Sequence, residues 1–589
     1  MQESKLEFDP VALRKKYRIE RDKRLRRDGN QQYLSVSGEF SNYVDDPHIE
    51  QEIKREPLTD TTQVIIIGGG FGGLIAAARL SQAGVGSIRV VEKGGDFGGT
   101  WYWNRYPGAR CDTESNAYMY YFSKEIINAW EWSERYPQQA EIQRYLNFVT
   151  DQLGLRPNIQ CNTRVQSARY DESAQRWTVT TDTGEQRQCT YLITAIGCLS
   201  SANVPDIAGR DTFGGDWYHT GQWPHEGVDF TGKRVAVIGT GSTGIQAIPV
   251  IAQQAAQVTV FQRTANYSIP ARNAPLTNDE KQYAKAHADE FRHVMTHNTN
   301  GHAFWIDDVN VFDVTDAERQ AKYQAAWDRG GLQFRATFKD LLTSEASNDT
   351  AAGFIKARIL DVVTDPQKAA DLTDFDHPFA AKRPPIDSQY FETYNLPHVH
   401  LVNLRKDPIQ QITADGIQTE SALHACDIIV FATGFDAMTG AFNKIEFTGR
   451  DGRQLKDTWH AGPKTYLGLQ IPGFPNLFTI TGPGSPSVLT NLPPQIEQHV
   501  DWITDCIAHM RQHKVRTIEA TEEAADTWGA EVNRAANATL LAGVKHSWYL
   551  GANVPGKPRM FMPYAGGLKR YRDACDAVAA DNYRGFEMR

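Results

Sequence analysis

Two glycine-rich segments, far apart in the chain, have the spacing of loops that bind the pyrophosphate of a dinucleotide. Residues 68–73 read GGGFGG and follow the apolar run 64–67, and residues 239–244 read GTGSTG and follow the apolar run 235–238. Such loops bring backbone N–H groups and the positive end of a helix dipole close to phosphate. The sequence therefore predicts two dinucleotide sites, formed by Gly68, Gly70, Phe71, Gly73, Gly239, Thr240, Gly241, Ser242, Thr243 and Gly244.

The residue that ends the strand after each loop indicates which dinucleotide binds there. The apolar run 88–91 ends in Glu92, and a carboxylate at this position accepts hydrogen bonds from a free ribose diol. The run 258–261 is followed by Gln262, Arg263 and Thr264, and a guanidinium there binds a phosphate on the ribose. We therefore predict FAD or NAD at the first loop, NADP at the second, and transfer of a hydride between them.

An aromatic segment follows the first loop. Residues 98–112 read GGTWYWNRYPGARCD and are dense in aromatic, glycine and charged residues. Such a stretch can enclose a flat ring system, which favours FAD over NAD at the first loop. Composition alone leaves open the alternative that these tryptophans are ordinary core residues.

The elements that position these residues indicate an α/β fold with two Rossmann-like dinucleotide-binding domains, for FAD and NADP, and an inserted helical subdomain. The chain is predicted to begin with an N-terminal extension at 1–60, which contains a basic helix at 11–27. Three further parts are predicted after it. Residues 61–200 and 433–589 form the FAD-binding domain, 201–269 and 379–432 the NADP-binding domain, and 270–378 the helical subdomain. Residues 200–230, rich in Gly, Pro, Asp and Trp, are expected to be a linker.

Composition excludes several classes of function. The chain has 589 residues, 41% of them hydrophobic and 23% charged, as in globular proteins with more than one core. A net charge of −9 disfavours nucleic acid or an anionic membrane as a partner. No apolar stretch is long enough to span a bilayer, and the charged residues after Met1 do not resemble a signal peptide.

Cysteine usage points to a reducing compartment. The 7 cysteines include no CxxC pair, which argues against a zinc site, a disulfide framework and a redox dithiol. We therefore expect a cytoplasmic protein. Whether it is a monomer or a homodimer stays open.

The segment 213–224, which reads FGGDWYHTGQWP, resembles the fingerprint of Baeyer–Villiger monooxygenases, FxGxxxHxxxW followed by Pro or Asp. It lies directly before the second βαβ unit, as it does in that family. Residues 98–112, 432–436, 482–487 and 547–553 are also similar, so the resemblance covers almost everything from about 62 to 575. Within the fingerprint, His219 is expected to hold the linker in place rather than to transfer a proton.

The resemblance implies an FAD monooxygenase that uses NADPH and O₂ to insert one oxygen atom next to a ketone carbonyl, giving an ester or lactone. In that chemistry a flavin C4a-peroxide adds to the ketone and forms a Criegee intermediate with negative charge on oxygen. A fixed cation must face that charge, and arginine suits because it stays protonated at any working pH.

The resemblance also assigns roles to individual residues. It makes Arg383 the catalytic arginine, Asp112 the carboxylate that holds it, and Lys382 a partner of Arg263 at the NADP ribose phosphate. Two prolines after Arg383 depart from the family pattern and are expected to stiffen its loop. The remaining cofactor-binding residues are Thr100, Trp101, Tyr118, Val165 and Trp548, and candidate walls of the substrate cavity are Val488, Leu489 and Thr490.

Three alternatives remain at this point. A related FAD and NADPH monooxygenase acting on amines or sulfides is disfavoured by the Trp223-Pro224 and Lys382-Arg383 pairs. A disulfide reductase is disfavoured because no two cysteines have suitable spacing. A non-catalytic flavoprotein that senses redox state is the third. The sequence does not identify the substrate, for which bulky cyclic ketones are the favoured class.

Overall fold

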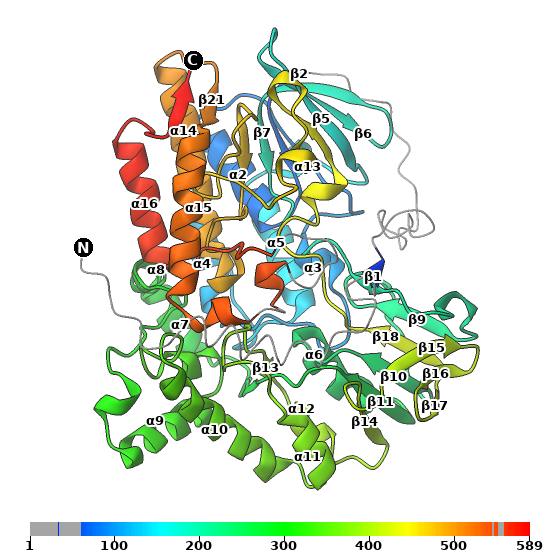
Figure 1. Cartoon of the computed structure of the whole chain (residues 1–589). Coiled ribbons are helices and arrows are strands. Elements are labelled where there is room, and N and C mark those ends of the chain that lie inside the picture. The colour runs from blue at the N-terminus through cyan, green and yellow to red at the C-terminus, as the bar shows by residue number, and fades with distance from the viewer. Residues whose placement is uncertain (1–32, 35–60, 545–546, 552–558) are drawn as a thin grey trace.

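The computed structural model describes residues 33–34, 61–544, 547–551 and 559–589. The basic helix predicted at 11–27 lies outside the described residues. Figure 1 shows two separate large sheets, with a group of long C-terminal helices beside the first sheet. The second sheet and the helices α9 (Asp316–Arg329), α10 (Glu345–Val362) and α11 (Pro366–Leu372) lie together in the lower half of the view. The α/β class with two Rossmann-like units is confirmed.

The first sheet has eight strands, contributed by segments near both ends of the described chain. In sheet order these are β19 (Glu446–Thr448), β5 (Val165–Asp171), β6 (Arg176–Thr181), β7 (Gln186–Thr194), β2 (Thr61–Ile67), β3 (Ile88–Val91) and β4 (Ile159–Gln160), with β20 (Leu477–Thr479) paired to β7. β2 runs parallel to both β3 and β7, and Val64, Ile65 and Ile66 on it are completely buried. Because both faces of β2 are covered, its apolar run is continuous rather than alternating.

Helices cover the first sheet from two parts of the sequence. α2 (Phe71–Gln82) follows the first glycine loop, and α14 (Leu492–Gln512) packs directly against it. α15 (Glu522–Asn537) and α16 (Leu568–Ala580) stand beside α14 in Figure 1. The C-terminal segment therefore completes the core around the first sheet. In the part of the chain that is described, no helix is both long enough and apolar enough to cross a bilayer.

The second sheet has five strands, all parallel. Their order is β14 (Val399–Asn403), β11 (Gln257–Gln262), β10 (Arg234–Ile238), β18 (Ile428–Phe431) and β9 (Asp216–His219). α6 (Ser242–Ala252) follows the second glycine loop, and Pro249 lies inside it without ending it. The prediction that 200–230 is only a linker is wrong, because β9 forms an edge of this sheet. Its four residues, Asp216–His219, are too few to show an alternating apolar pattern in the sequence.

Helices occupy most of 270–378, which confirms the helical character predicted there. The longer ones are α7 (Asn278–Ala286), α8 (Ala288–His297), α9 (Asp316–Arg329), α10 (Glu345–Val362) and α11 (Pro366–Leu372). Local sequence explains where several begin. Thr277 with Glu280, and Thr315 with Glu318, form capping boxes, and Asp365 caps α11 ahead of a proline at its first position.

The remaining strands form small sheets. These pair β1 (Tyr33–Leu34) with β8 (Val204–Pro205), β12 (Ile269–Pro270) with β13 (Ile386–Asp387), and β21 (Ile518–Ala520) with β22 (Phe586–Met588), and they join β15 (Ile409–Thr413), β16 (Gly416–Thr419) and β17 (Leu423–Ala425).

A buried carboxyl group on α14 makes stability depend on pH. Glu497 accepts a hydrogen bond from the backbone N–H of Tyr121, and Arg292 lies 3.9 Å from its other oxygen. Burial raises the pKa of Glu497 from 4.5 to about 7. Because the folded-state pKa is the higher one, the folded protein holds a proton that the unfolded chain releases. Stability is therefore lost as the pH rises from about 4.5 to 7.

Glu497→Gln should remove this loss. At pH 8 its free energy of unfolding should exceed that of the wild type by up to about 3 kcal/mol, and near pH 4 the difference should vanish. Urea unfolding at several pH values measures this, with Glu523→Gln on the exposed side of α15 as the control. An equal effect of Glu497→Gln at every pH would contradict a raised pKa.

Candidate active site

The first glycine loop is shaped by close backbone contacts. Gly68 has φ +107°, and a Cβ there would lie 2.4 Å from the carbonyl oxygen of Ala195. A Cβ on Gly73 would lie 1.9 Å from the carbonyl oxygen of Gly68. Gly70 is the N-cap residue of α2, and no side chain caps the first N–H groups of that helix. These N–H groups and the positive helix end are thus available to an anion.

The second loop repeats this construction on the other sheet. Gly239 has φ +113°, and its Cβ would lie 2.4 Å from the carbonyl oxygen of Ala432, while a Cβ on Gly244 would meet the carbonyl oxygen of Gly239 at 2.3 Å. Gly241 is the N-cap residue of α6. Unlike Gly239 and Gly244, it has no atom within 4 Å of the position that a Cβ would occupy. The space in front of this helix end is therefore open, as the approach of a pyrophosphate requires.

The residues predicted to distinguish the two riboses stand beside their loops. Glu92 is buried, and its carboxylate accepts hydrogen bonds from the N–H groups of Gly69 at 2.6 Å and Gly94 at 2.8 Å. Arg263 is exposed directly after β11. The hydroxyl of Thr240 donates to the carbonyl oxygen of Thr264 at 2.9 Å, which ties the second loop to this strand end.

The aromatic segment 98–112 connects the two loops. At its start the N–H of Gly98 donates to the carbonyl oxygen of Gly69 at 2.9 Å. Further along, the Tyr106 hydroxyl donates to Gln246 of α6 at 2.8 Å, and the Gln246 amide donates to the carbonyl oxygen of Arg110 at 3.1 Å. The segment thus runs from the first loop to the helix of the second and ends at Asp112.

The other residues predicted on the flavin side fall into two groups. α3 (Thr100–Trp103) begins with exposed Thr100, and the indole N–H of buried Trp101 donates to the hydroxyl of Tyr118 at 3.2 Å. Val165 instead lies in the hydrophobic core with Ile67 and Val91. The structure therefore places Trp101 and Tyr118 together beside the first loop, and Val165 in the core cluster that also holds Val91, the residue before Glu92.

Arg383 and Asp112 form a two-point ion pair. The Nε of Arg383 lies 2.7 Å from Oδ2 of Asp112, and Nη2 lies 2.8 Å from Oδ1. Nη1 donates to the carbonyl oxygen of Val488 at 3.2 Å, and each charged side chain is only about one fifth exposed, at 23% and 22%. Burial alone would lower the pKa of Arg383, but the charge of Asp112 and the hydrogen bonds raise it above the usual value. Arg383 is therefore a permanent cation held in a fixed orientation.

The backbone around this pair is conformationally unusual. Ala380, just before the arginine loop, has φ +60°, and Ser487, just before Val488, has φ +47°. Residues with a Cβ adopt the left-handed region at a cost and do so mainly where the surrounding structure enforces it. Both segments that hold the guanidinium are thus constrained.

Comparison with known proteins decides the family. A family model for pyridine nucleotide-disulphide oxidoreductases matches residues 65–318. A Baeyer-Villiger monooxygenase of Pseudooceanicola batsensis is 43% identical over 523 residues, which are 88% of this chain and 95% of the relative. The chain belongs to the Baeyer–Villiger monooxygenases.

Solved structures of similar enzymes agree with this assignment. An oxidized steroid monooxygenase bound to NADP is 48% identical, with a TM-score of 0.86 over 90% of this chain and 99% of that one. The enzyme OTEMO in complex with FAD and NADP is 39% identical, also with a TM-score of 0.86, over 91% of this chain and 100% of that one. This Baeyer–Villiger monooxygenase therefore shares its fold with these relatives over about nine tenths of its chain.

The predicted structural role of the fingerprint histidine agrees with its surroundings. His219 is buried at the end of β9, where its Nδ1 accepts a hydrogen bond from the N–H of Gly221 at 3.0 Å and its ring meets Phe435 edge-on. Burial lowers the pKa of His219 to about 4, so the ring is neutral. The histidine thus joins β9 to the segment after β18.

Three residues near the ion pair were not predicted from the sequence. His302 lines a small cavity with Asp112 and Thr113, and burial together with the positive charges of Arg383 and Arg335 holds its pKa well below the usual value. Tyr549 is buried, which raises the pKa of its hydroxyl, and the positive charges of Arg383 and Arg335 oppose that rise. His302 and Arg335 lie in the helical block without any motif, so no sequence signal identifies them.

An apolar cluster borders the arginine on the side of the C-terminal residues. It includes Val488 and Tyr549, with Leu489 and Trp548 packed against it. Trp548 lies in the short helix η12 (Trp548–Leu550), 4.4 Å from the ring of Tyr549. Thr490, by contrast, is buried and donates to Gln495 at 2.9 Å. Two of the three candidate wall residues thus belong to the apolar surface near Arg383.

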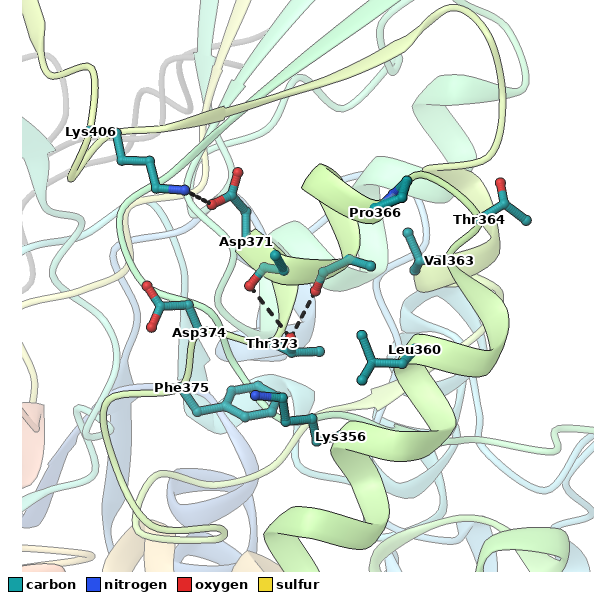
Figure 2. Close-up of a pocket in the computed structure, with 12 residues that line it drawn as sticks. Lys356, Leu360, Val363, Thr364, Pro366, Asp371, Thr373, Asp374, Phe375 and Lys406 are labelled. Atoms are coloured by element: carbon teal, nitrogen blue, oxygen red, sulfur yellow. Dashed lines mark hydrogen bonds and ion pairs between the residues drawn. The ribbon is translucent and has the colours of Figure 1, made fainter.

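A separate surface cavity of about 780 Å³ lies between α10, α11 and the loop that follows them (Figure 2). Figure 2 shows Lys406 reaching the carboxylate of Asp371, with Nζ and Oδ1 2.6 Å apart. Gln262, the residue before Arg263, donates to the carbonyl oxygen of Asp371 at 2.7 Å. None of the residues predicted for catalysis or cofactor binding lines this cavity.

Proposed function

We propose that this monooxygenase uses NADPH and O₂, with FAD, to insert one oxygen atom next to the carbonyl of a bulky cyclic ketone. The observation that carries the proposal is the ion pair of Arg383 with Asp112, at the end of the segment that joins the two glycine loops. A Baeyer–Villiger reaction needs a permanent, oriented cation where negative charge develops on oxygen. The names of the similar enzymes support the same chemistry.

The residues present fit both cofactors. At the first loop, the uncapped end of α2, the carboxylate of Glu92 and the aromatic pair of Trp101 and Tyr118 suit FAD. At the second loop, the open space at Gly241 and the cation of Arg263 suit NADP. When bound, NADPH supplies the hydride that reduces the flavin, and the reduced flavin activates molecular oxygen.

The chain's own groups have distinct tasks in this proposal. Arg383 stabilises the negative charge on the carbonyl oxygen of the substrate, and Asp112 keeps the guanidinium oriented without removing its proton. Neutral His302 adds no competing charge to the site. The apolar cluster around Val488 and Tyr549 keeps water away from the reacting carbonyl.

We further propose cofactor-binding roles for individual residues. Gly68, Gly70, Phe71, Gly73, Glu92, Thr100, Trp101, Tyr118 and Val165 are assigned to FAD, and the second loop with Arg263, Thr264, Lys382 and Trp548 to NADP. We also propose an FAD-binding domain of residues 61–200 and 433–589, an NADP-binding domain of 201–269 and 379–432, and a helical subdomain of 270–378, after an N-terminal extension at 1–60. None of the seven cysteines forms a disulfide within the described residues, which supports a location in the reducing cytoplasm.

Product analysis with labelled oxygen tests the function. The purified FAD enzyme, given NADPH, ¹⁸O₂ and a bulky cyclic ketone, should yield a lactone with one labelled atom in the ring. A parallel reaction with labelled water and ordinary oxygen should leave that atom unlabelled. Turnover of a tertiary amine or a thioether without any turnover of ketones would instead identify the related class of monooxygenase.

A further inference from the structure

A second arginine stands on the side of the helical block that faces the ion pair. Arg335 lies in the short 3₁₀-helix η7 (Leu332–Ala336). In a 3₁₀-helix, side chains three residues apart lie on the same face, so Arg335 shares a face with Leu332. Leu332 lines the small cavity that also contains Asp112 and His302. Phe334 faces away, completely buried in the aromatic core of the block.

Among the residues that the structure describes, no carboxylate pairs with Arg335. Among the described residues it makes no hydrogen bond and no ion pair, although its side chain is partly buried. Burial, followed by the positive charge of Arg383, lowers the pKa of Arg335 to about 10. The guanidinium is therefore still protonated at neutral pH, and it lies near enough to Arg383 for the two charges to repel.

The two carboxylates near this cavity, Asp112 and Glu114, already form ion pairs with other arginines. Asp112 is held by two hydrogen bonds to Arg383, and Glu114 is paired with Arg135 at 2.6 Å. His302 is neutral and supplies no negative charge. The site thus carries one positive charge that nothing in the described chain balances. An unpaired, partly desolvated charge costs folding free energy, and a ligand that supplies an anion recovers it.

We propose that Arg335 is a specificity-determining residue that binds a carboxylate on the substrate, so that the enzyme prefers ketones carrying an acidic group. This inference rests on the function proposed above. A guanidinium pairs with a planar carboxylate through two parallel hydrogen bonds, which would orient the ketone as well as hold it. The groups proposed for the dinucleotide phosphates are different ones, namely the uncapped helix ends at Gly70 and Gly241 and the side chain of Arg263.

Matched pairs of ketones test the preference. We would compare cyclohexanones that carry a carboxylate, acetate or propanoate arm opposite the carbonyl with their neutral methyl esters. With the wild-type enzyme, at least one acid should exceed its ester in kcat/KM by about 10- to 100-fold, the effect of a charge-assisted hydrogen bond. Arg335→Met should remove that advantage and leave the esters within about threefold.

Two further variants and a binding measurement complete the test. Arg335→Lys should retain part of the preference, and Arg329→Met, which removes an exposed arginine at the end of α9, should retain all of it. Calorimetry with the NADP⁺-loaded holoenzyme should show that cyclohexanecarboxylate binds at least about 10-fold more weakly to Arg335→Met than to the wild type.

The outcomes separate this inference from the function on which it rests. Equal use of every acid and its ester by the wild type, with no change in Arg335→Met, would overturn the role of Arg335 but leave the reaction intact. Weaker binding of NADP⁺ to Arg335→Met, with equal losses for acids and esters, would assign Arg335 to the nucleotide instead. Failure of the wild type to oxidise any ketone would overturn the proposed function, and this inference with it.

Discussion

Replacement of Arg383 by alanine is expected to lower ketone oxygenation by at least about 10³-fold while reduction of the flavin by NADPH continues. The loss of a single oriented donor to a developing oxyanion typically costs two to three orders of magnitude. Arg383 supplies a full charge as well as donors, and nothing else in the described site can take its place, since Arg335 has no carboxylate to orient it. Oxygen uptake should then yield hydrogen peroxide in place of lactone.

Stopped-flow reduction and product yield measure the two halves of this prediction separately. Arg383→Lys is the informative control, because it keeps a charge but loses the two-point contact with Asp112. We expect it to recover only a small part of the oxygenation. Unchanged lactone yield in Arg383→Ala would show that the catalytic cation has been misassigned, and loss of bound FAD would show a structural role instead.

Gly241→Ala is expected to raise the dissociation constant of NADP⁺ by at least about 100-fold, roughly 2.7 kcal/mol, without destabilising the protein. The added methyl group meets no protein atom within 4 Å, and the backbone of Gly241, with φ −81° and ψ −171°, suits alanine. It would instead occupy the space through which a pyrophosphate reaches the N–H groups of α6. Titration of NADP⁺ and the thermal midpoint measure the two effects.

Two other glycines provide the controls. Gly353, on α10, also has open space around its Cβ position, so Gly353→Ala should leave NADP⁺ binding unchanged. Gly244→Ala places a methyl group 2.3 Å from the carbonyl oxygen of Gly239, so it should lower the thermal midpoint as well as weaken binding. If Gly241→Ala bound NADP⁺ as tightly as the wild type, the second loop would not hold the pyrophosphate.

Local sequence was sufficient to predict several parts of this protein. Both glycine loops lie between a strand and a helix as expected, and Glu92 and Arg263 stand at the predicted strand ends. In the helical block at 270–378, Thr277 and Thr315 are the N-caps of α7 and α9, and each is followed three residues later by the glutamate of a capping box. These features depend on residues that are neighbours along the chain, so their side chains and backbone determine them directly.

Other features depend on contacts between distant residues. Arg383 and Asp112 are 271 residues apart, and only a family resemblance paired them before the fold was known. β9 has too few apolar residues to indicate a strand, and β18 beside it supplies the hydrogen bonds. Arg335 carries no motif at all. Its importance appears only when folding brings η7 close to Arg383, beside a cavity whose carboxylates are already paired.

The sequence by itself thus determined the two glycine loops, the residues at the strand ends beside them and the helical block, because these are short-range properties of backbone and side chain. The tertiary structure alone decided how the segment 98–112 connects the two loops and which positive charge near Arg383 stays unbalanced in the described chain. The segment 98–112 shows the reason. Its glycines and aromatic residues can be recognised from the sequence, but its path from Gly69 to Gln246 depends on contacts with both halves of the fold. The net charge of a site depends on groups that folding brings together from distant parts of the chain, so it cannot be read from any single stretch of sequence.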